Sequence, residues 1–206
     1  YPSYNNPGNI LDPYKSKQYE IGAKYSLNEK VLLTTALFRI EKANWYEETT
    51  SNGKINYSED GEQIHEGIEI GITGKVTDDF TVVAGGTLMD LSVEKATNPT
   101  LEGKKPTDAA SKMAKVYAEY EIPQIKGLAL TGGAYYTGKK YADEANLDIL
   151  PSYTLYDAGL RYKTKLEKYP TTFILNVQNL TDKDYWGSGT NLGDPRSVAF
   201  SMKMEF

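Results

Sequence analysis

Residues 171–206 read TTFILNVQNLTDKDYWGSGTNLGDPRSVAFSMKMEF, and this stretch decides the fold. In its final eleven residues, apolar side chains occupy alternate positions, with small, polar or charged residues between them. The apolar positions are Val198, Phe200, Met202, Met204 and Phe206. This period of two predicts a strand with one apolar face and one polar face. Soluble β-sandwiches and membrane barrels both use such strands, so the alternation alone leaves both possibilities open.

The composition excludes some classes of protein. The 206 residues are 39% hydrophobic and 25% charged, carry a formal charge of −5 and include no cysteine. The chain has no run of about eighteen apolar residues, which excludes a transmembrane helix, whereas a membrane barrel averages polar because only alternate residues face lipid. The 17 tyrosines against 5 phenylalanines suit the interfacial girdles of a barrel. The acidic balance and the lack of a basic stripe argue against nucleic-acid binding.

Alternating residues along the rest of the chain predict about nine strands. The expected ranges are 16–27, 31–48, 64–76, 80–93, 113–120, 128–137 and 153–163, followed by two strands within 171–206. The connections alternate between long polar segments (49–62, 94–112 and 138–151) and short ones (28–30, 77–79, 123–127 and 164–170). Outer-membrane barrels sort their connections in this way, with short periplasmic turns and longer extracellular loops.

Several motifs, in this order along the chain, resemble one protein family. They are Gln18-Tyr19-Glu20-Ile21-Gly22-Ala23-Lys24, Gly67-Ile68-Glu69, Asn176-Val177-Gln178-Asn179-Leu180 with Asp182 and Tyr185, Gly193-Asp194-Pro195-Arg196, and the terminal Phe206. Together they resemble the C-terminal end of the TonB-dependent outer-membrane receptors, especially the siderophore-receptor branch. Residues 109–112 depart from the family pattern, which usually has a proline-containing entry to the next strand.

The resemblance implies an all-β fold, namely an antiparallel up-and-down transmembrane β-barrel segment of about nine strands. Transporters with a plugged lumen have 22 strands, so residues 1–206 would form a C-terminal segment of the barrel domain. The plug domain and the N-terminal strands would lie outside this chain, and residues 1–15 would be the tail of a long extracellular loop. Such a segment is expected to form an open curved sheet or to have its edges capped by a neighbouring molecule.

The resemblance also implies a function, which is to form the wall of a Gram-negative outer-membrane receptor for TonB-dependent uptake of a ferric siderophore. The expected partners are the ferric siderophore, the TonB-ExbB-ExbD complex acting through the missing N-terminal part, the barrel-assembly machinery that recognises Phe206, and outer-membrane lipid. The siderophore would be the transported ligand, and no cofactor is expected on protein side chains. The alternatives are a receptor for haem, cobalamin or a saccharide, a passive channel or adhesin, and a soluble β-rich binding domain.

The sequence offers no candidate for catalysis or for metal binding. The single histidine, His65, rules out a multi-histidine metal site, and no nucleophile motif accompanies it. His65 lies on the polar side of its strand, where a barrel has its lumen. Asp157 and Arg161 share one strand face, and we expect them to join a luminal ion-pair network.

Aromatic residues are the candidates for ligand contact and for the lipid interface. By resemblance, extracellular loops hold the ferric chelate, which makes Tyr57, Tyr141, Tyr185 and Trp186 the binding candidates. Trp45, Tyr46 and Tyr136 fit the outer aromatic girdle better. A further expectation concerns Ile68, Ile70 and Ile72, whose shared parity predicts a lipid-facing band.

Overall fold

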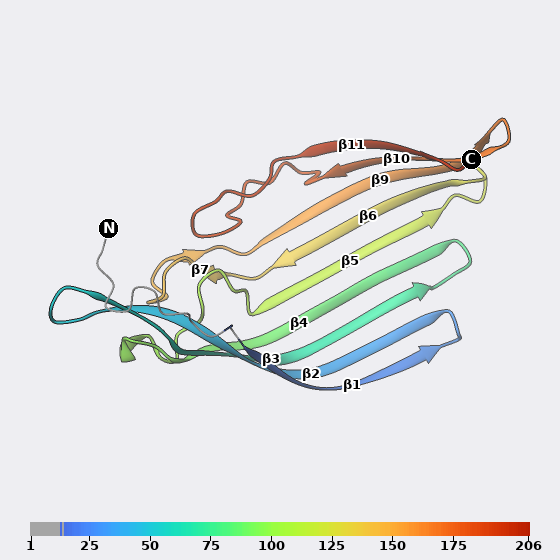
Figure 1. The fold of residues 1–206 in the computed structure, drawn as a ribbon. Coiled ribbons are helices and arrows are strands. Elements are labelled where there is room, and N and C mark those ends of the chain that lie inside the picture. The colour runs from blue at the N-terminus through green and yellow to red at the C-terminus, as the bar shows by residue number, and fades with distance from the viewer. Residues whose placement is uncertain (1–12, 14) are drawn as a thin grey trace.

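The computed structural model describes residue 13 and residues 15–206, except for the side chains of 45–48 and 56–60. Nine strands form one antiparallel sheet in which spatial neighbours follow each other along the chain (Figure 1). They are β1 (Ser16–Leu27), β2 (Val31–Thr49), β3 (Ile55–Lys75), β4 (Phe80–Lys95), β5 (Lys112–Glu121), β6 (Leu128–Thr137), β9 (Tyr153–Leu166), β10 (Tyr169–Gln178) and β11 (Ser197–Met204). The all-β antiparallel prediction is therefore confirmed.

Two small elements interrupt the connections. A hairpin of β7 (Lys140–Tyr141) and β8 (Ile149–Leu150) lies between β6 and β9. A short 3-10 helix, η1 (Pro99–Leu101), follows β4, and the Asn98 side chain caps it by accepting a hydrogen bond from Thr100 N. No helix in the described part of the chain is long and apolar enough to cross a membrane.

The strand register creates one apolar face. Residues paired directly across antiparallel strands point to the same side of a sheet. One row of such partners crosses six strands and consists only of large apolar residues: Phe80, Tyr120, Leu130, Leu160, Leu175 and Phe200. Ile68, Ile70 and Ile72 belong to the same face, because Ile72 pairs with Ala84 and, through it, with Val116 and Ala134. We call this side of the sheet the apolar face.

The other side of the sheet, which we call the polar face, has a different composition in the same six strands. The adjacent row there runs through Thr81, Glu119, Thr131, Gly159, Asn176 and Ala199. These residues are small, polar or charged, whereas each of them adjoins a large apolar residue of the row described above. The alternation predicted for single strands therefore continues from strand to strand across β4, β5, β6, β9, β10 and β11.

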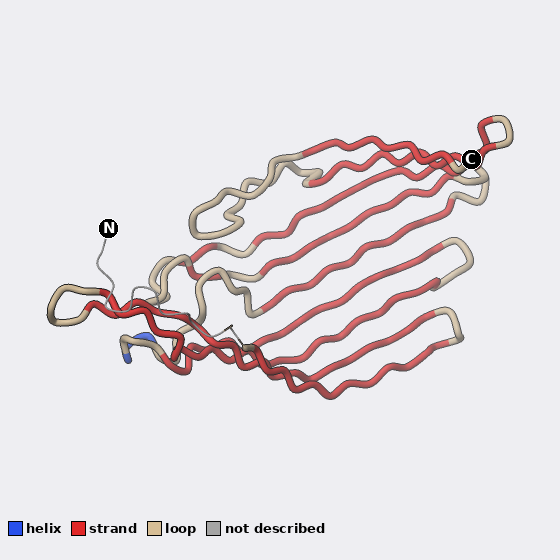
Figure 2. The backbone as a smooth tube through the Cα atoms, viewed as in Figure 1, coloured by secondary structure: helices blue, strands red, loops and turns tan. Residues whose placement is uncertain are grey.

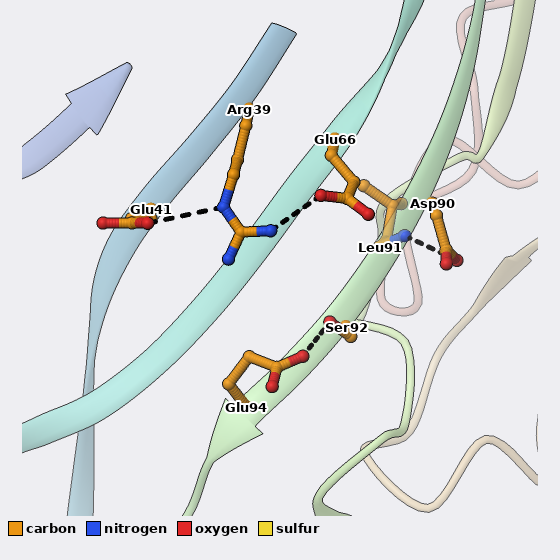
Figure 3. Close-up of polar contacts among 7 residues, drawn as sticks. All are labelled: Arg39, Glu41, Glu66, Asp90, Leu91, Ser92 and Glu94. Atoms are coloured by element: carbon orange, nitrogen blue, oxygen red, sulfur yellow. Dashed lines mark hydrogen bonds and ion pairs between the residues drawn. The ribbon is translucent and has the colours of Figure 1, made fainter. Parts of the chain in front are cut away.

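The apolar face ends abruptly on the side of the long loops. One row of partners on this face consists of Ile21, Leu37, Ile68 and Leu88. The next row on the same face, two residues away along each strand, consists of Tyr19, Arg39, Glu66 and Asp90. Arg39 bonds Glu66 at 2.7 Å (Nη1–Oε2) and Glu41 at 3.4 Å (Nε–Oε1), as Figure 3 shows. Charged side chains are costly in the hydrocarbon region of a bilayer. This step therefore marks the limit of the apolar band on this face.

The connections are sorted between the two ends of the sheet. Figure 2 shows short turns at one end of the sheet, and the extended β2–β3 hairpin together with the long loops at the other. One turn depends on Gly127, which has a φ of +87° and packs so closely against Lys163 that an added Cβ would lie 2.0 Å from the Lys163 carbonyl oxygen. The C-terminus lies at the end with the tight turns (Figure 1).

The hydrophobic core is minimal because the sheet is a single layer. Among the described residues, the buried apolar side chains are Leu91, Ala110, Ala129 and Leu150. In contrast, Ile21, Ile70 and Phe200 on the apolar face are 61–73% exposed. A continuous exposed apolar surface of this kind is typical of a protein that contacts lipid or another protein.

Two boundaries differ from the sequence-based expectation. Most of residues 49–62 was expected to be a loop, but β2 and β3 continue as a hairpin to Thr49 and Ile55, with a bulge between Asn44 and Tyr46. Residues 55–62 read INYSEDGE and lack the regular apolar and polar alternation by which strands are recognised. The connection expected over 164–170 is also shorter, because β9 continues to Leu166 and β10 begins at Tyr169.

Candidate ligand site: the long loops and the polar face

Three long loops lie at the same end of the sheet: the β4–β5 loop (96–111), the β6–β9 loop (138–152) and the β10–β11 loop (179–196). The first two are joined by a reciprocal pair of hydrogen bonds. Lys105 N donates to Asn146 Oδ1 at 2.7 Å, and Asn146 Nδ2 donates to Lys105 O at 2.9 Å. The two loops therefore hold a fixed position relative to each other.

The β10–β11 loop is tied to both of the others. Lys140, only 5% exposed, donates from Nζ to Gly187 O at 2.5 Å. The Asp108 carboxylate accepts a hydrogen bond from Gly189 N at 2.8 Å, while Asp108 N donates to Tyr141 O at 2.9 Å. Sequence analysis did not identify Asp108 or Lys140, because their partners are far away along the chain and no spacing motif connects them.

The β7–β8 hairpin is closed by an acidic side chain. Asp148 N donates to Asp143 Oδ1 at 2.6 Å, and Ala142 N donates to Asp148 O at 2.9 Å. The hydrogen bond from the Asp148 amide is the main cause of the lowered pKa of Asp143, because it stabilises the carboxylate. Asn146 completes the turn with a φ of +61°, a conformation that asparagine tolerates well.

Tyr185, one of the predicted ligand contacts, is packed into the β10–β11 loop. Its ring centroid lies 4.3 Å from that of Tyr153. The ring also lies against the backbone of Gly193, where an added Cβ would be 2.0 Å from Tyr185 Cζ. Burial raises the pKa of the Tyr185 hydroxyl. Tyr185 therefore shapes the loop through packing.

The other aromatic candidates have different positions. Trp186 is 44% exposed and its backbone forms a bridge with Leu192. Tyr141 is half-buried in β7, with the Lys139 ammonium 5.7 Å from its ring centroid. The hydrogen bonds between the loops hold the segments that carry Tyr141 and Trp186 close together. The side chain of Tyr57 lies outside the described residues.

The remaining aromatic candidates were assigned to the outer girdle. Tyr136 lies on the apolar face, where it pairs with Ala114 and Thr154. The side chains of Trp45 and Tyr46 lie outside the described residues. The position of Tyr136 in an outer aromatic girdle stays a prediction.

The end of β10 is organised by Asn179, the second asparagine of the Asn-Val-x-Asn-Leu motif. This side chain is 4% exposed, its φ is +48°, and its Nδ2 donates to Lys183 O at 3.0 Å and to Asp194 O at 3.1 Å. Its Oδ1 accepts from Lys183 N at 2.8 Å, and its backbone N–H donates to Asp157 Oδ1 at 3.0 Å. Asn179 thus fastens the two ends of the β10–β11 loop to each other and to β9.

The polar face carries an ion pair that spans three strands. Arg161 on β9 bonds both carboxylate oxygens of Glu119 on β5 and lies 3.7 Å from Glu121. The guanidinium passes over Ala129 of β6, whose small side chain is 1% exposed. Arg161 thus forms the expected ion pairs, but its partners are these glutamates. Asp157 instead accepts the Asn179 backbone N–H, because its position next to the end of β10 brings it within hydrogen-bonding distance.

A shallow hollow of about 200 Å³ lies on the polar face over β5, β6, β9 and β10. Its lining includes Tyr117, Tyr135, Asp157, Asn176 and Gln178. Tyr135 lies flat over Gly133, where an added Cβ would be 2.6 Å from the Tyr135 hydroxyl. Phenol, amide and carboxylate groups there can accept and donate hydrogen bonds.

His65 also belongs to the polar face, between Ile40 of β2 and Leu91 of β4. Its Nε2 is buried and has no hydrogen-bond partner in the described part of the chain. Within the same part of the chain, no group of three or more histidine, cysteine, aspartate or glutamate side chains could hold a metal ion.

Comparison with known proteins identifies the family. Residues 1–180 match the family described as "TonB dependent receptor-like, beta-barrel". The ferrichrome receptor FcuA of Yersinia enterocolitica is 33% identical over 207 residues, which cover 98% of this chain and 27% of that protein. The ferrichrome outer membrane transporter/phage receptor of Escherichia coli K12 is 33% identical over 188 residues, covering 89% of this chain and 25% of that protein.

Solved structures have the same arrangement of strands. The ferric preacinetobactin receptor BauA of Acinetobacter baumannii superposes with a TM-score of 0.84 at 32% identity, covering 99% of this chain and 31% of that one. The siderophore receptor PiuA of the same organism gives a TM-score of 0.75 at 27% identity, covering 94% and 29%. The chain therefore spans about a quarter to a third of the length of the relatives that it matches. It belongs to the TonB-dependent receptor β-barrel family.

Proposed function

We propose that this chain forms the C-terminal part of the wall of a receptor that takes up a ferric siderophore across the outer membrane, in a TonB-dependent manner. The main support is the match over nearly the whole chain, in sequence and in fold, to proteins named as ferrichrome and preacinetobactin receptors. Family membership places the chain in the outer membrane of a Gram-negative bacterium. In that setting the apolar face contacts lipid, the polar face lines the lumen and the long loops are extracellular.

The rest of the receptor completes the barrel and supplies energy coupling. β1 and β11 are the two edges of the sheet and do not pair with each other. Unpaired strand edges are not tolerated in the hydrocarbon region of a bilayer. We therefore assign the missing partners of both edges, a plug within the lumen and the contact with the TonB-ExbB-ExbD complex to parts of the receptor outside residues 1–206. The side chains of this chain hold no cofactor in this proposal.

An uptake assay in the native host tests the proposal. The intact gene is deleted and restored, and radioactive iron is supplied as ferrichrome or as a ferric catecholate. We expect uptake of at least one chelate to be lost on deletion, restored with the gene, and absent in a host without TonB. Loss of haem or cobalamin uptake alone would assign another ligand to the receptor. Uptake that persists without TonB would indicate a passive channel.

A second experiment concerns assembly, for which we propose Phe206 as the residue that the barrel-assembly machinery recognises. Phe206 is 97% exposed, and its ring lies 5.2 Å from that of Tyr169. Because it packs so little, replacing it with serine is expected to have a small effect on the stability of the folded barrel. We nevertheless expect Phe206→Ser to reduce the amount of heat-modifiable receptor in outer-membrane fractions several-fold, with total synthesis unchanged.

The conservative variant Phe206→Tyr provides the control, because it keeps an aromatic terminus and should assemble normally. Normal assembly of Phe206→Ser would show that recognition does not depend on this side chain.

A further inference from the structure

The three long loops form a closed triangle of hydrogen bonds. The β4–β5 and β6–β9 loops share the Lys105–Asn146 pair, and the β6–β9 and β10–β11 loops share the bond from Lys140 to Gly187. The third side of the triangle joins the β4–β5 and β10–β11 loops. In the described part of the chain, its hydrogen bond is the one from Gly189 N to the Asp108 carboxylate.

Asp108 is the only described residue that bonds both of the other loops. Its backbone N–H holds Tyr141 O of the β6–β9 loop, and its carboxylate holds Gly189 N of the β10–β11 loop. To make both contacts, its backbone adopts a φ of +58°. This conformation is unfavourable for most residues, and aspartate is among the few that adopt it readily. The hydrogen bonds hold a conformation that the isolated loop would rarely adopt.

The contact between the loops has a tight steric fit. An added Cβ at Gly189 would lie 3.1 Å from the Cβ of Ala142, so the β10–β11 loop packs directly against the β6–β9 loop at this point. Lys140 lies beside this contact and is almost fully buried, with its ammonium directed to Gly187 O. Hydrogen bonds and packing therefore act at the same junction.

We propose that Asp108 is a positioning residue that couples the three loops, so that they open and close as one body. The segments bearing Tyr141 and Trp186 would then present one preformed surface to the ligand, and contact with one loop would be transmitted to the other two. The role of this body in ligand capture rests on the proposed function. The coupling itself is a property of the ligand-free receptor.

The test uses the intact receptor and two substitutions that separate the carboxylate from the backbone. Asp108→Gly keeps the freedom to adopt a positive φ but removes the acceptor. Asp108→Asn keeps an acceptor oxygen and tolerates the same φ. The loss of one hydrogen bond corresponds to a change of about five- to tenfold in a local opening equilibrium. We expect Asp108→Gly to accelerate amide exchange by that factor in both 138–152 and 179–196, and Asp108→Asn to restore much of the protection.

A distance measurement provides an independent readout. Residues 1–206 contain no cysteine, so spin labels on Glu144→Cys and Thr190→Cys report the separation of the two loops in an intact receptor from which any cysteine outside these residues has been removed. We expect the distribution of distances to broaden in Asp108→Gly and to stay narrow in Asp108→Asn, with exchange in the strands unchanged. Faster exchange confined to 96–111, together with an unchanged distribution, would overturn the coupling. Both measurements are made without siderophore, so a negative uptake assay does not affect them.

Discussion

Replacing Ile70 with arginine is expected to lower the free energy of unfolding of the intact receptor in a bilayer by about 2–4 kcal/mol. Ile70 lies between Ile68 and Ile72, in the part of the apolar face that we propose contacts lipid, and is 61% exposed. An arginine there would have to place its guanidinium in hydrocarbon or distort the bilayer to reach water. The measurement is reversible urea unfolding of the receptor in lipid vesicles.

The same strand offers a matched control. Thr73 lies on the polar face of β3, opposite Leu32 and Val83. Thr73→Arg adds the same charge and bulk, but it directs them toward the aqueous lumen. We expect its effect to be within about 0.5 kcal/mol, as for other surface substitutions. Equal losses from the two substitutions would show that the apolar face does not contact lipid.

The second large effect is expected at Asn179. Asn179→Ala removes three side-chain hydrogen bonds, each contributing about 1 kcal/mol, and leaves the Lys183 amide and two carbonyls without these partners. It also places alanine at a φ of +48°, which adds strain. We expect a loss of about 3 kcal/mol in the unfolding free energy, together with faster amide exchange across the β10–β11 loop.

Asn176 is the matched control for this substitution, since it is the other asparagine of the same motif. It is exposed on the polar face, and its side chain makes no hydrogen bond within the described residues. Asn176→Ala is expected to change stability by less than about 0.5 kcal/mol. Similar losses at both positions would contradict the assignment of the loop anchor to Asn179.

This pair of asparagines shows how far the sequence could predict the structure. The motif contains both residues and does not show which of them is buried, because a linear pattern contains no information on burial. Only the fold shows that Asn179 lies between the two ends of a loop, while Asn176 is exposed on the polar face. The strands, in contrast, could be predicted, because the alternation between the two faces is a local pattern of neighbouring residues, as in β1 and β6.

The parts that the sequence did not predict are those without a local pattern. The start of β3, residues 55–62, has no regular alternation of apolar and polar residues, so it was indistinguishable from a loop. The ties at Asp108 and Lys140 join residues far apart in sequence, and each depends on where the loops meet in space. For Arg161 the expected ion pair exists, but its reach over Ala129 to β5 required the register of three strands.

The single-layer wall also constrains how the length of this chain can change in evolution. Adding one residue in the middle of β6 would move each following position, up to the next turn, to the opposite face, so that a residue such as Tyr135 would lie on the apolar face. Adding two residues would keep each following side chain on its own face but would shift its pairing with the neighbouring strands by two residues. Insertions and deletions are therefore expected to be concentrated in 96–111, 138–152 and 179–196. The single-layer wall thus confines variation in length to the end of the sheet that carries the long loops.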